Sequence, residues 1–338
     1  MKKILAVFIC IVLIIGCLSG CVSGAALNAA DEDTLKIVAT IFPEYDWVMN
    51  ILGDNPANAD VLLLLDNGTD LHSFQPTVQD ILNISSCDLL IYVGGESDAW
   101  INDVLREAVN KDMKTVCLMD VLENSVKEEE LVQGMQEGRP GTVNNRSEED
   151  CAEEEPEYDE HVWLSLRNAA LIVDSIEKAL EELDPGNAQT YRDNAAAYKN
   201  KLDSLDEEYR KVISESPLDT LLFADRFPFR YLTDDYGLSY YAAFAGCSAE
   251  TEASFNTIVF LIEKVDELSL PAVLIIDGAD DRLAQTIVRS TRSKTQDILT
   301  LNSLQSITSK DIRNGASYLS AMEENLEVLK KALGNAVS

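Results

Sequence analysis

The stretch Leu35-Lys36-Ile37-Val38-Ala39-Thr40 opens an alternation of apolar strands and amphipathic helices that decides the fold. Helical patterns over Tyr45–Leu52 and Thr77–Ser86 separate this first strand from two further apolar runs, Val61–Leu65 and Leu89–Gly94. Strands that are apolar along their whole length are buried on both faces. Such strands, alternating with helices, indicate a parallel sheet that is covered on both sides.

The second half of the chain repeats the alternation, with Thr220–Ala224 and Ala272–Ile276 as its clearest strands. Between the halves, Asn187–Ile213 is a long, mostly polar helix without glycine or proline. A polar helix of this length can bridge two domains. We therefore predict an α/β protein in which two Rossmann-like lobes with parallel sheets are joined by a long rigid backbone helix.

The first residues have the pattern of an export signal. Met1-Lys2-Lys3 is followed by an apolar core and then by Leu18-Ser19-Gly20-Cys21, which resembles a bacterial lipobox. Cleavage there would leave Cys21 as a lipidated N-terminus, so we expect an extracytoplasmic protein that is lipid-anchored to the bacterial cell membrane. The apolar core is shorter than the ~20 residues of a membrane-spanning helix. The alternative is an uncleaved anchor, because residues 25–27 extend the apolar stretch.

The predicted domain organisation follows from these patterns. In chain order it comprises a signal peptide with lipobox (1–21), a tether (22–33), an N-terminal α/β lobe (34–185), the linking helix (186–214) and a C-terminal α/β lobe (215–338). Inside the first lobe, residues 123–160 are rich in glutamate and poor in apolar residues, so we predict a disordered acidic loop there. This loop is either a solvated insertion or a weak cation-capturing segment.

The chain carries a formal net charge of −32 at pH 7. This charge excludes nucleic acid and anionic lipid surfaces as partners, because both would be repelled. Of the seven cysteines, Cys87, Cys117, Cys151 and Cys247 lie beyond the signal region. None belongs to a CxxC pair that would indicate a zinc knuckle, and the three ways to pair four cysteines stay open.

The chain has two histidines, and each lies in a short motif. His72 belongs to Gly68-Thr69-Asp70-Leu71-His72-Ser73-Phe74-Gln75-Pro76-Thr77, and His161 begins His161-Val162-Trp163-Leu164 after the acidic segment. Imidazole is a common metal ligand, and its pKa lies near neutral pH. The two motifs are therefore the first candidates for a binding site.

The ends of the predicted strands supply further candidates, because ligands of parallel α/β sheets bind beyond the carboxyl ends of the strands. The loop with His72 follows one strand, Asp225 and Arg226 follow another, and Asp277 follows a third. Two imidazoles and a carboxylate that converge from both lobes suit zinc or manganese. We accordingly predict that His72, His161 and Asp277 are ligands of Zn²⁺ or Mn²⁺.

These residues also carry a resemblance to a known family. The chain resembles the cluster A-I solute-binding lipoproteins, which are periplasmic-binding proteins of ABC importers for zinc and manganese. The matching pieces, in order, are Thr40-Ile41-Phe42-Pro43, Gly68 to Pro76, Tyr92-Val93-Gly94-Gly95-Glu96 with Trp100, His161-Val162-Trp163-Leu164, Asp184-Pro185, Tyr236-Gly237-Leu238 and Asn325-Leu326. The resemblance spans most of the mature chain and implies a metal held between two lobes around a backbone helix. It also implies delivery of the ion to a membrane permease that is powered by a separate ATPase, and we expect the chain itself to be a monomer.

Two departures from the family pattern concern the metal. The glutamate-rich loop lacks the histidines that members often carry there, and Arg226 stands where the family commonly has a third histidine. Arginine has no lone pair to donate and cannot be a ligand. The family's fourth ligand, an acid after a late strand, matches Asp277.

Two hypotheses follow from Arg226. In the first, His72, His161 and Asp277 hold the ion, and a water or a nearby carboxylate fills the gap. The candidate carboxylates are Asp225, Glu250 and Glu252. In the second, Arg226 pairs with Asp277, and the site has lost the metal or takes an anionic or complexed ligand.

Two other classes of function compete with metal import. An adhesin-like surface lipoprotein would use the same scaffold with a vestigial cleft. A metal hydrolase would use an open coordination position. The sequence contains no HExxH motif, nucleophile elbow or phosphate loop, so we do not expect an enzyme.

Overall fold

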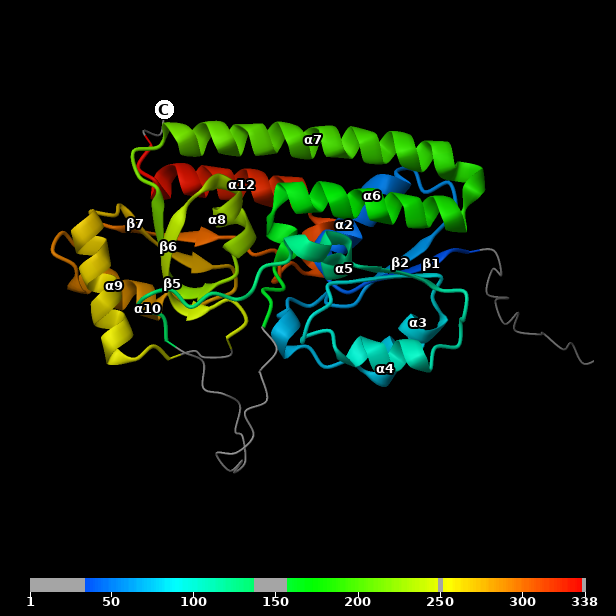
Figure 1. The fold of residues 1–338 in the computed structure, drawn as a ribbon, viewed down its shortest axis with the longest axis horizontal. Coiled ribbons are helices and arrows are strands. Elements are labelled where there is room, and N and C mark those ends of the chain that lie inside the picture. Colours follow the sequence, from blue (N-terminus) through cyan, green and yellow to red (C-terminus); the bar gives the residue numbers. More distant parts are fainter. Residues whose placement is uncertain (1–33, 137–156, 249–251, 336–338) are drawn as a thin grey trace, which may run out of the picture. The chain divides into compact units, whose positions relative to one another are not determined.

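Parallel sheets form the centre of each half of the chain in the computed structural model (Figure 1). The structure describes residues 34–136, 157–248 and 252–335, and all features below belong to the unit Leu35–Ser338. The predicted signal peptide, the lipidated Cys21 and the tether lie outside the described residues, as does Glu250. No helix in the described part of the chain is long and apolar enough to cross a membrane.

The N-terminal sheet has the strand order β2-β1-β3-β4, and its strands pair in parallel. Its strands are β1 (Lys36–Ala39), β2 (Asp60–Leu63), β3 (Leu89–Tyr92) and β4 (Lys114–Cys117). The helices of this half are α2 (Phe42–Leu52), α3 (Val78–Ser86), α4 (Trp100–Arg106) and α5 (Leu118–Leu122). In β1, Ile37 pairs with Val61 on one side and with Leu89 on the other. This central position explains why the strand is apolar along most of its length.

The C-terminal sheet repeats this order as β6-β5-β7-β8, again with parallel pairs. Its strands are β5 (Thr220–Phe227), β6 (Ser239–Ala245), β7 (Ala272–Ile276) and β8 (Asp297–Leu301). The helices of this half are α8 (Arg230–Tyr236), α9 (Phe255–Leu268), α10 (Arg282–Ser290) and α11 (Ser309–Arg313). The strand order reverses between β1 and β3 and between β5 and β7. Ligands of α/β sheets bind beyond the strand ends at such switch points.

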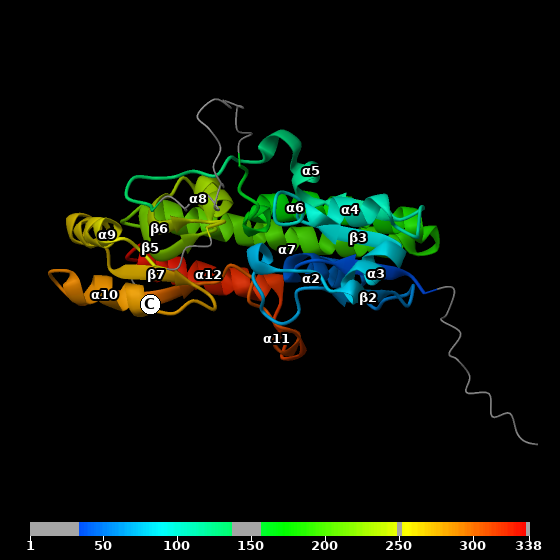
Figure 2. The same cartoon turned by 90° about the horizontal axis from the view of Figure 1, so that it is seen from below.

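One long helix runs along both halves of the chain (Figure 1 and Figure 2). α6 (Leu166–Leu183) leads through a 3₁₀ turn into α7 (Ala188–Glu215), and the two helices lie side by side in Figure 1. α7 is 28 residues long and is the predicted backbone helix. Tyr198 of α7 donates to Asp46 of α2 at 3.3 Å, and Tyr209 donates to the carbonyl of Met322 at 2.5 Å. Because Met322 belongs to α12 (Tyr318–Ala332), α7 ties the N-terminal half to the closing helix.

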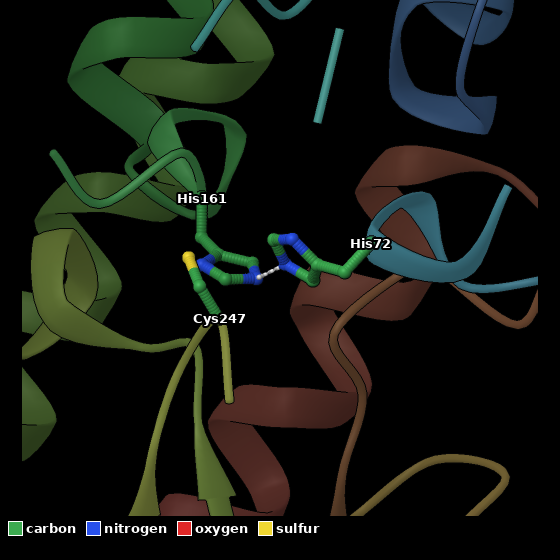
Figure 3. Close-up of side chains that lie close together, drawn as sticks. All are labelled: His72, His161 and Cys247. Carbon is green, nitrogen blue, oxygen red and sulfur yellow. Dashed lines mark hydrogen bonds between the residues drawn. The ribbon is translucent and has the colours of Figure 1, made fainter. Parts of the chain in front are cut away.

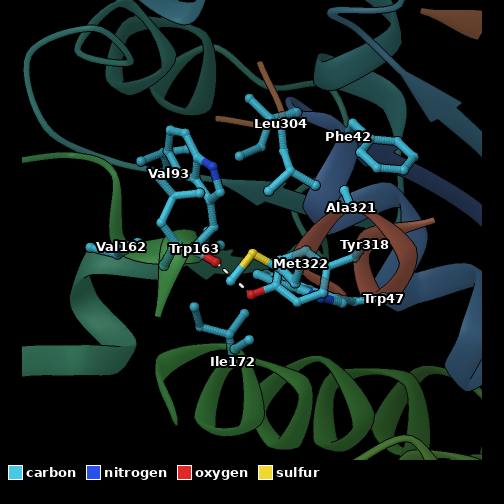
Figure 4. Packing of buried hydrophobic residues seen from close by; sticks show 14 of the residues in the cluster. Phe42, Trp47, Val93, Val162, Trp163, Ile172, Leu304, Tyr318, Ala321 and Met322 are labelled. Atoms are coloured by element: carbon cyan, nitrogen blue, oxygen red, sulfur yellow. Dashed lines mark hydrogen bonds between the residues drawn. The ribbon is translucent and has the colours of Figure 1, made fainter. Parts of the chain in front are cut away.

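A continuous apolar core lies where the two halves meet (Figure 4). The fully buried Trp163 donates through Nε1 to the carbonyl of Ser303, which follows β8, at 2.9 Å. The carbonyl of Trp163 accepts from Tyr318 Oη at 2.7 Å. The Tyr318 ring meets Trp47 of α2 edge-on, with centroids 5.2 Å apart. This packing fixes the segment that begins at His161.

The acidic segment is ordered at both ends, so the prediction of a disordered loop is wrong for its flanks. Glu128 pairs with Tyr158 in an antiparallel bridge, and Gln136 pairs with Phe244 of β6 in a parallel bridge. We call residues 126–136 the acidic strap. The strap runs from the N-terminal half to the edge of the C-terminal sheet, and the middle of the predicted loop lies outside the described residues.

Candidate metal centre

His72 and His161 face each other, and their Nε2 atoms are 3.2 Å apart (Figure 3). His72 lies in the 3₁₀ helix Leu71–Ser73, at whose start the side chain of Asp70 accepts a hydrogen bond from the His72 N–H at 3.0 Å. His161 stands just before the 3₁₀ helix Val162–Leu164. The structure therefore brings together the two imidazoles that the sequence motifs selected.

The carboxylate of Asp159 holds the His161 ring. Its Oδ1 accepts from the His161 backbone N–H at 2.8 Å and lies 3.0 Å from the ring Nδ1. Both side chains are buried, so water does not compete for this contact. An imidazole that donates through Nδ1 to a carboxylate presents the lone pair of Nε2, as metal-bound histidines do.

Ser97 and Glu160 hold the His72 ring on the side away from His161. The His72 Nδ1 lies 2.7 Å from Ser97 Oγ and 3.6 Å from Glu160 Oε2. Glu160 Oε1 accepts from the Ser97 N–H at 2.9 Å, whereas Oε2 is buried without a hydrogen-bond partner among the described residues. Gly95 permits this approach, because a Cβ at its φ of 80° would overlap the Glu160 carboxylate.

The His72 ring is neutral in this environment. Burial, together with the nearby His161 ring and the Arg226 guanidinium, lowers the pKa of His72 to about 3. Burial also raises the pKa of Glu160. Because only the neutral imidazole ligates a metal, His72 is in the form that a cation requires.

Cys247 joins the two histidines, although the sequence interpretation missed it. Its Sγ, one ring nitrogen of His72 and one ring nitrogen of His161 all lie within 4.8 Å of one another. Within the described ranges, this is the group of three or more His, Cys, Asp or Glu side chains that is close enough to hold an ion. Cys247 follows β6 by two residues, so the strand-end argument would have found it had it been applied to that strand.

Two contacts fix the loop that carries Cys247. Glu129 of the acidic strap accepts a hydrogen bond from the Cys247 N–H at 2.9 Å. A Cβ at Gly246 would lie 2.8 Å from the carbonyl of Phe227 and 3.2 Å from His161 Cε1, so glycine allows the loop to approach the ring. Burial and the surrounding carboxylates raise the pKa of the Cys247 thiol.

Arg226 pairs with neither of the carboxylates that the sequence suggested, Asp225 and Asp277. Its Nη2 lies 2.6 Å from Asp70 Oδ2, which contradicts the hypothesis of an Arg226–Asp277 pair. Burial alone would raise the pKa of Asp70, but the guanidinium outweighs it and the pKa is lowered. The ion pair joins β5 to the residue that begins the His72 helix.

Asp277 and Asp225 stand apart from the histidine pair. Asp277 Oδ1 accepts from the N–H and Oγ of Ser303 at 2.5 and 2.7 Å, and Oδ2 accepts from the N–H of Ser306 at 3.2 Å and from its Oγ. These bonds hold the loop after β8. Asp225 accepts from two backbone N–H groups, at 2.8 and 3.2 Å, and burial raises its pKa.

Most of the other site residues predicted from the sequence line a cavity of about 900 Å³. Its charged lining includes Asp70, Asp225, Arg226, Glu252 and Asp277. Glu252 is exposed, and neither histidine belongs to the lining. The candidates from the C-terminal half thus surround a space beside the histidine pair and do not join it.

Comparisons with known proteins show which proteins the chain and its fold resemble. The zinc-binding lipoprotein AdcA of Streptococcus pneumoniae is 30% identical over 336 residues, which cover 98% of this chain and 61% of that protein. The high-affinity zinc uptake system protein ZnuA of Bacillus subtilis is 27% identical over 324 residues, which cover 96% of this chain and 95% of that protein. The crystal structure of the zinc-bound ZnuA-like domain of Streptococcus pneumoniae AdcA matches with a TM-score of 0.67 and 28% identity, covering 89% of this chain and 99% of that domain.

The chain therefore spans about three fifths of the length of the first of these relatives. A profile of the family described as zinc-uptake complex component A, periplasmic, matches residues 37–332. That match covers both sheets and all the side chains of the site. The chain belongs to the zinc-uptake complex component A (ZnuA) family.

Proposed function

We propose that the chain is the extracytoplasmic zinc-binding component of an ABC importer, which holds Zn²⁺ between its two lobes and passes it to the permease. The observation that carries this proposal is the convergence of His72 Nε2 and His161 Nε2 at 3.2 Å. Two nitrogens that ligate one tetrahedral Zn²⁺ at ~2.05 Å lie ~3.3 Å apart. The pair therefore has the spacing that zinc requires.

The setting of the two rings supports a cation as the bound species. Each ring has its Nδ1 engaged by the protein, through Asp159 for His161 and through Ser97 for His72. The buried Glu160 carboxylate beside His72 adds negative charge, and no Lys or Arg among the described residues forms an ion pair with it. Carboxylates behind the ligating histidines raise the basicity of the rings and fix their orientation.

The relatives support zinc as the cargo in preference to manganese. AdcA of Streptococcus pneumoniae is a zinc-binding lipoprotein, and ZnuA of Bacillus subtilis is a zinc uptake system protein. Imidazole nitrogen suits zinc, whereas manganese favours carboxylate, carbonyl and water oxygen. The carboxylates of Asp277 and Asp225, which would suit manganese, already accept hydrogen bonds from the protein.

The rest of the proposed role draws on the sequence and the family. We expect Cys21 to carry the lipid anchor, and a membrane permease with a separate ATPase to receive the ion from a monomeric chain. The adhesin alternative requires a vestigial cleft. Its premise is weakened here, because both histidines face one point with their Nδ1 atoms engaged.

Equilibrium zinc binding tests the first part of the proposal. The metal-free chain is titrated with zinc against a chromophoric chelator of known affinity, and we expect one tightly bound ion per chain. The double variant His72→Ala/His161→Ala should lose this binding while its thermal unfolding stays cooperative. Binding of equal affinity and stoichiometry in the double variant would overturn the site.

Growth under zinc limitation tests the transport role. A strain without the gene should grow poorly in chelator-treated medium, and the wild-type chain should restore growth. The double histidine variant, expressed to the same level, should fail to do so. Restoration of growth by that variant would overturn the proposed role in import.

A further inference from the structure

Arg226 stands at the position where the family commonly has a third histidine, and its positive charge is paired with Asp70. Arg226 lies near the end of β5, and its guanidinium is paired with Asp70 at 2.6 Å. Arginine offers no lone pair, so it cannot ligate a cation. Asp277 is held by Ser303 and Ser306, so a ligand from the C-terminal half would have to come from another position.

The strand beside β5 offers that position. In the parallel pairing of β5 and β6, Arg226 is opposite Phe244 and Phe227 is opposite Ala245. Cys247 follows Ala245 by two residues, so it emerges at the same edge of the sheet as Arg226. Its Sγ lies within 4.8 Å of one ring nitrogen of each histidine. Figure 3 shows the three side chains close together.

The chain around Cys247 holds the side chain at this point. Glu129 accepts from the Cys247 N–H at 2.9 Å, and the N–H of Gln136 in the same strap donates to the Ala243 carbonyl of β6 at 2.9 Å. Gly246 leaves room for His161. The strap, the strand and the glycine thus determine together where the thiol lies.

The other free cysteines of the described residues have different surroundings. Cys87 is buried at the end of α3, and its Sγ donates to the carbonyl of Ile84 at 3.2 Å. Cys117 lies at the end of β4, and its Sγ donates to the carbonyl of Val93 at 3.6 Å. Cys247 is the one in this described set that belongs to a group with two imidazoles.

We propose that Cys247 is the third protein ligand of the ion, as a thiolate that replaces the histidine displaced by Arg226, and that it makes the site selective for zinc-like thiophilic cations. This inference rests on the proposed function. When the Sγ–metal bond forms, the thiol proton leaves to solvent. Two imidazoles and a thiolate suit zinc, whereas manganese prefers oxygen ligands. The nearby carboxylates of Asp159 and Glu160 offset the remaining positive charge.

Cobalt substitution tests the thiolate directly, because a cobalt–thiolate bond gives a ligand-to-metal charge-transfer band in the near ultraviolet. Co²⁺ is added to the full chain, kept reduced and free of other metals. We expect one ion per chain and the charge-transfer band in the wild type. Cys247→Ser should lose the band. Cys117→Ser is the matched control, and Cys151→Ser is a second control for a cysteine outside the described residues; both should keep the band.

The outcomes separate this inference from the proposed function. Stoichiometric cobalt binding by the wild type without the band would overturn the role of Cys247 and leave the zinc-binding function standing. A band that persists in Cys247→Ser would do the same. If the wild type binds neither zinc nor cobalt, both proposals fail. The wild-type spectrum decides the matter even if Cys247→Ser does not fold.

Selectivity gives an independent measurement. Cys247→Ser should weaken zinc binding by at least ~100-fold, because the loss of a group that only supports a ligand already costs about 10–100-fold. Manganese binding should change much less, so the preference for zinc should shrink. An unchanged ratio of zinc to manganese affinity in Cys247→Ser would overturn the claim of selectivity.

Discussion

The motif residues on the N-terminal and C-terminal sides of the site differ in whether their side chains are available to a bound cation. On the N-terminal side, His72 and His161 turn their Nε2 atoms toward one point and are held from behind. On the C-terminal side, Arg226 and Asp277 are both engaged in other bonds. In both motifs a carboxylate two residues before the histidine, Asp70 or Asp159, accepts from the histidine backbone N–H, so local sequence sets where the side chain starts. The partners of Arg226 and Asp277 come from distant segments, which the motifs do not contain.

The carboxylates of the two sides show the same contrast. Asp159 and Glu160 face the imidazoles, and Glu160 keeps one buried oxygen without a partner among the described residues. Both oxygens of Asp277 accept hydrogen bonds from two serines. Negative charge on the first side is available to a cation, whereas on the second side it holds a loop.

The largest effect should follow from removing an imidazole of the N-terminal side. His161→Ala should lower zinc affinity by at least ~100-fold, because loss of a supporting group alone costs about 10–100-fold. Competition with a fluorescent chelator measures it. Glu252→Gln, at an exposed residue of the cavity, is the control and should stay close to the wild type. Equal losses of zinc affinity in the two variants would show that the two sides do not differ in their role in binding.

A smaller effect should follow from neutralising the carboxylate behind His161. Asp159→Asn can still accept from the ring Nδ1 and from the backbone, but it lacks the charge. We expect a loss of zinc affinity of about 10–100-fold. The same competition titration measures it, and urea unfolding checks that the metal-free variant is intact. An affinity equal to that of the wild type would show that the carboxylate only shapes the local turn.

Asp277→Asn should affect stability and leave zinc binding nearly unchanged. The new amide would direct donor hydrogens at serine donors, so one or more of the bonds to Ser303 and Ser306 should be lost. A buried polar group that loses its hydrogen-bond partner lowers the free energy of unfolding by about 1–3 kcal/mol. Urea unfolding of the metal-free chain measures the stability. A loss of zinc affinity as large as that of Asp159→Asn would instead make Asp277 a ligand.

The pH dependence of stability should also come from the N-terminal side. Burial, and next the charge of Asp98, raises the pKa of Glu44 to about 8 from an unfolded value of 4.5. Between these pH values the folded chain holds a proton that the unfolded chain releases. The contribution of Glu44 to the free energy of unfolding is therefore fully present below pH 4.5. It falls as the pH rises toward 8, with a slope of up to ~1.4 kcal/mol per pH unit.

Urea unfolding of the metal-free chain between pH 5 and 8 measures this slope, and Glu44→Gln should reduce it. Glutamine imitates the protonated acid, and its carbonyl can still accept from Thr40 and Ile41. Asp98, whose pKa burial raises to about 7, should leave a residual slope of the same sign. A slope unchanged by Glu44→Gln would show that this carboxyl group is ionised in the folded chain.

The parts of the molecule that the sequence predicted are those set by local patterns. The apolar run Leu35–Thr40 was predicted as a buried strand and contains β1, and the apolar face of α7 recurs at helical spacing. His72 stands two residues from its cap, Asp70, so the motif contains both parts.

The pairing of Arg226 with Asp70 was beyond prediction for the opposite reason. It spans 156 residues, and its choice over Asp225 and Asp277 depends on how the two sheets meet. Cys247 was missed because the strand-end argument was not applied to the strand that precedes it, and because a lone cysteine resembles ordinary core. In the structure, Glu129 and Gly246 hold the loop that places Cys247 beside His161.

The smallest expected change in zinc affinity concerns Arg226, and it is the most direct test of the difference between the two sides. Its positive charge is one of the causes that lower the pKa of His72, so it opposes any cation bound there. Arg226→Met removes that charge and also leaves Asp70 unpaired, and both changes favour a bound cation. Since a partly exposed ion pair contributes ~0–1 kcal/mol, we expect zinc affinity to rise by about two- to fivefold.

Competition titration measures this change, with Arg282→Met as the control. Arg282 also lines the cavity but pairs with Asp280 at the surface, so its removal should leave zinc affinity unchanged. If Arg226→Met weakens zinc binding instead, the Arg226–Asp70 bond must hold the His72 helix in place for the ion. The C-terminal side would then take part in binding through an ion pair as well as through Cys247. The two sides would differ only in how they contribute, the N-terminal side through imidazole ligands and the C-terminal side through a thiolate and an ion pair.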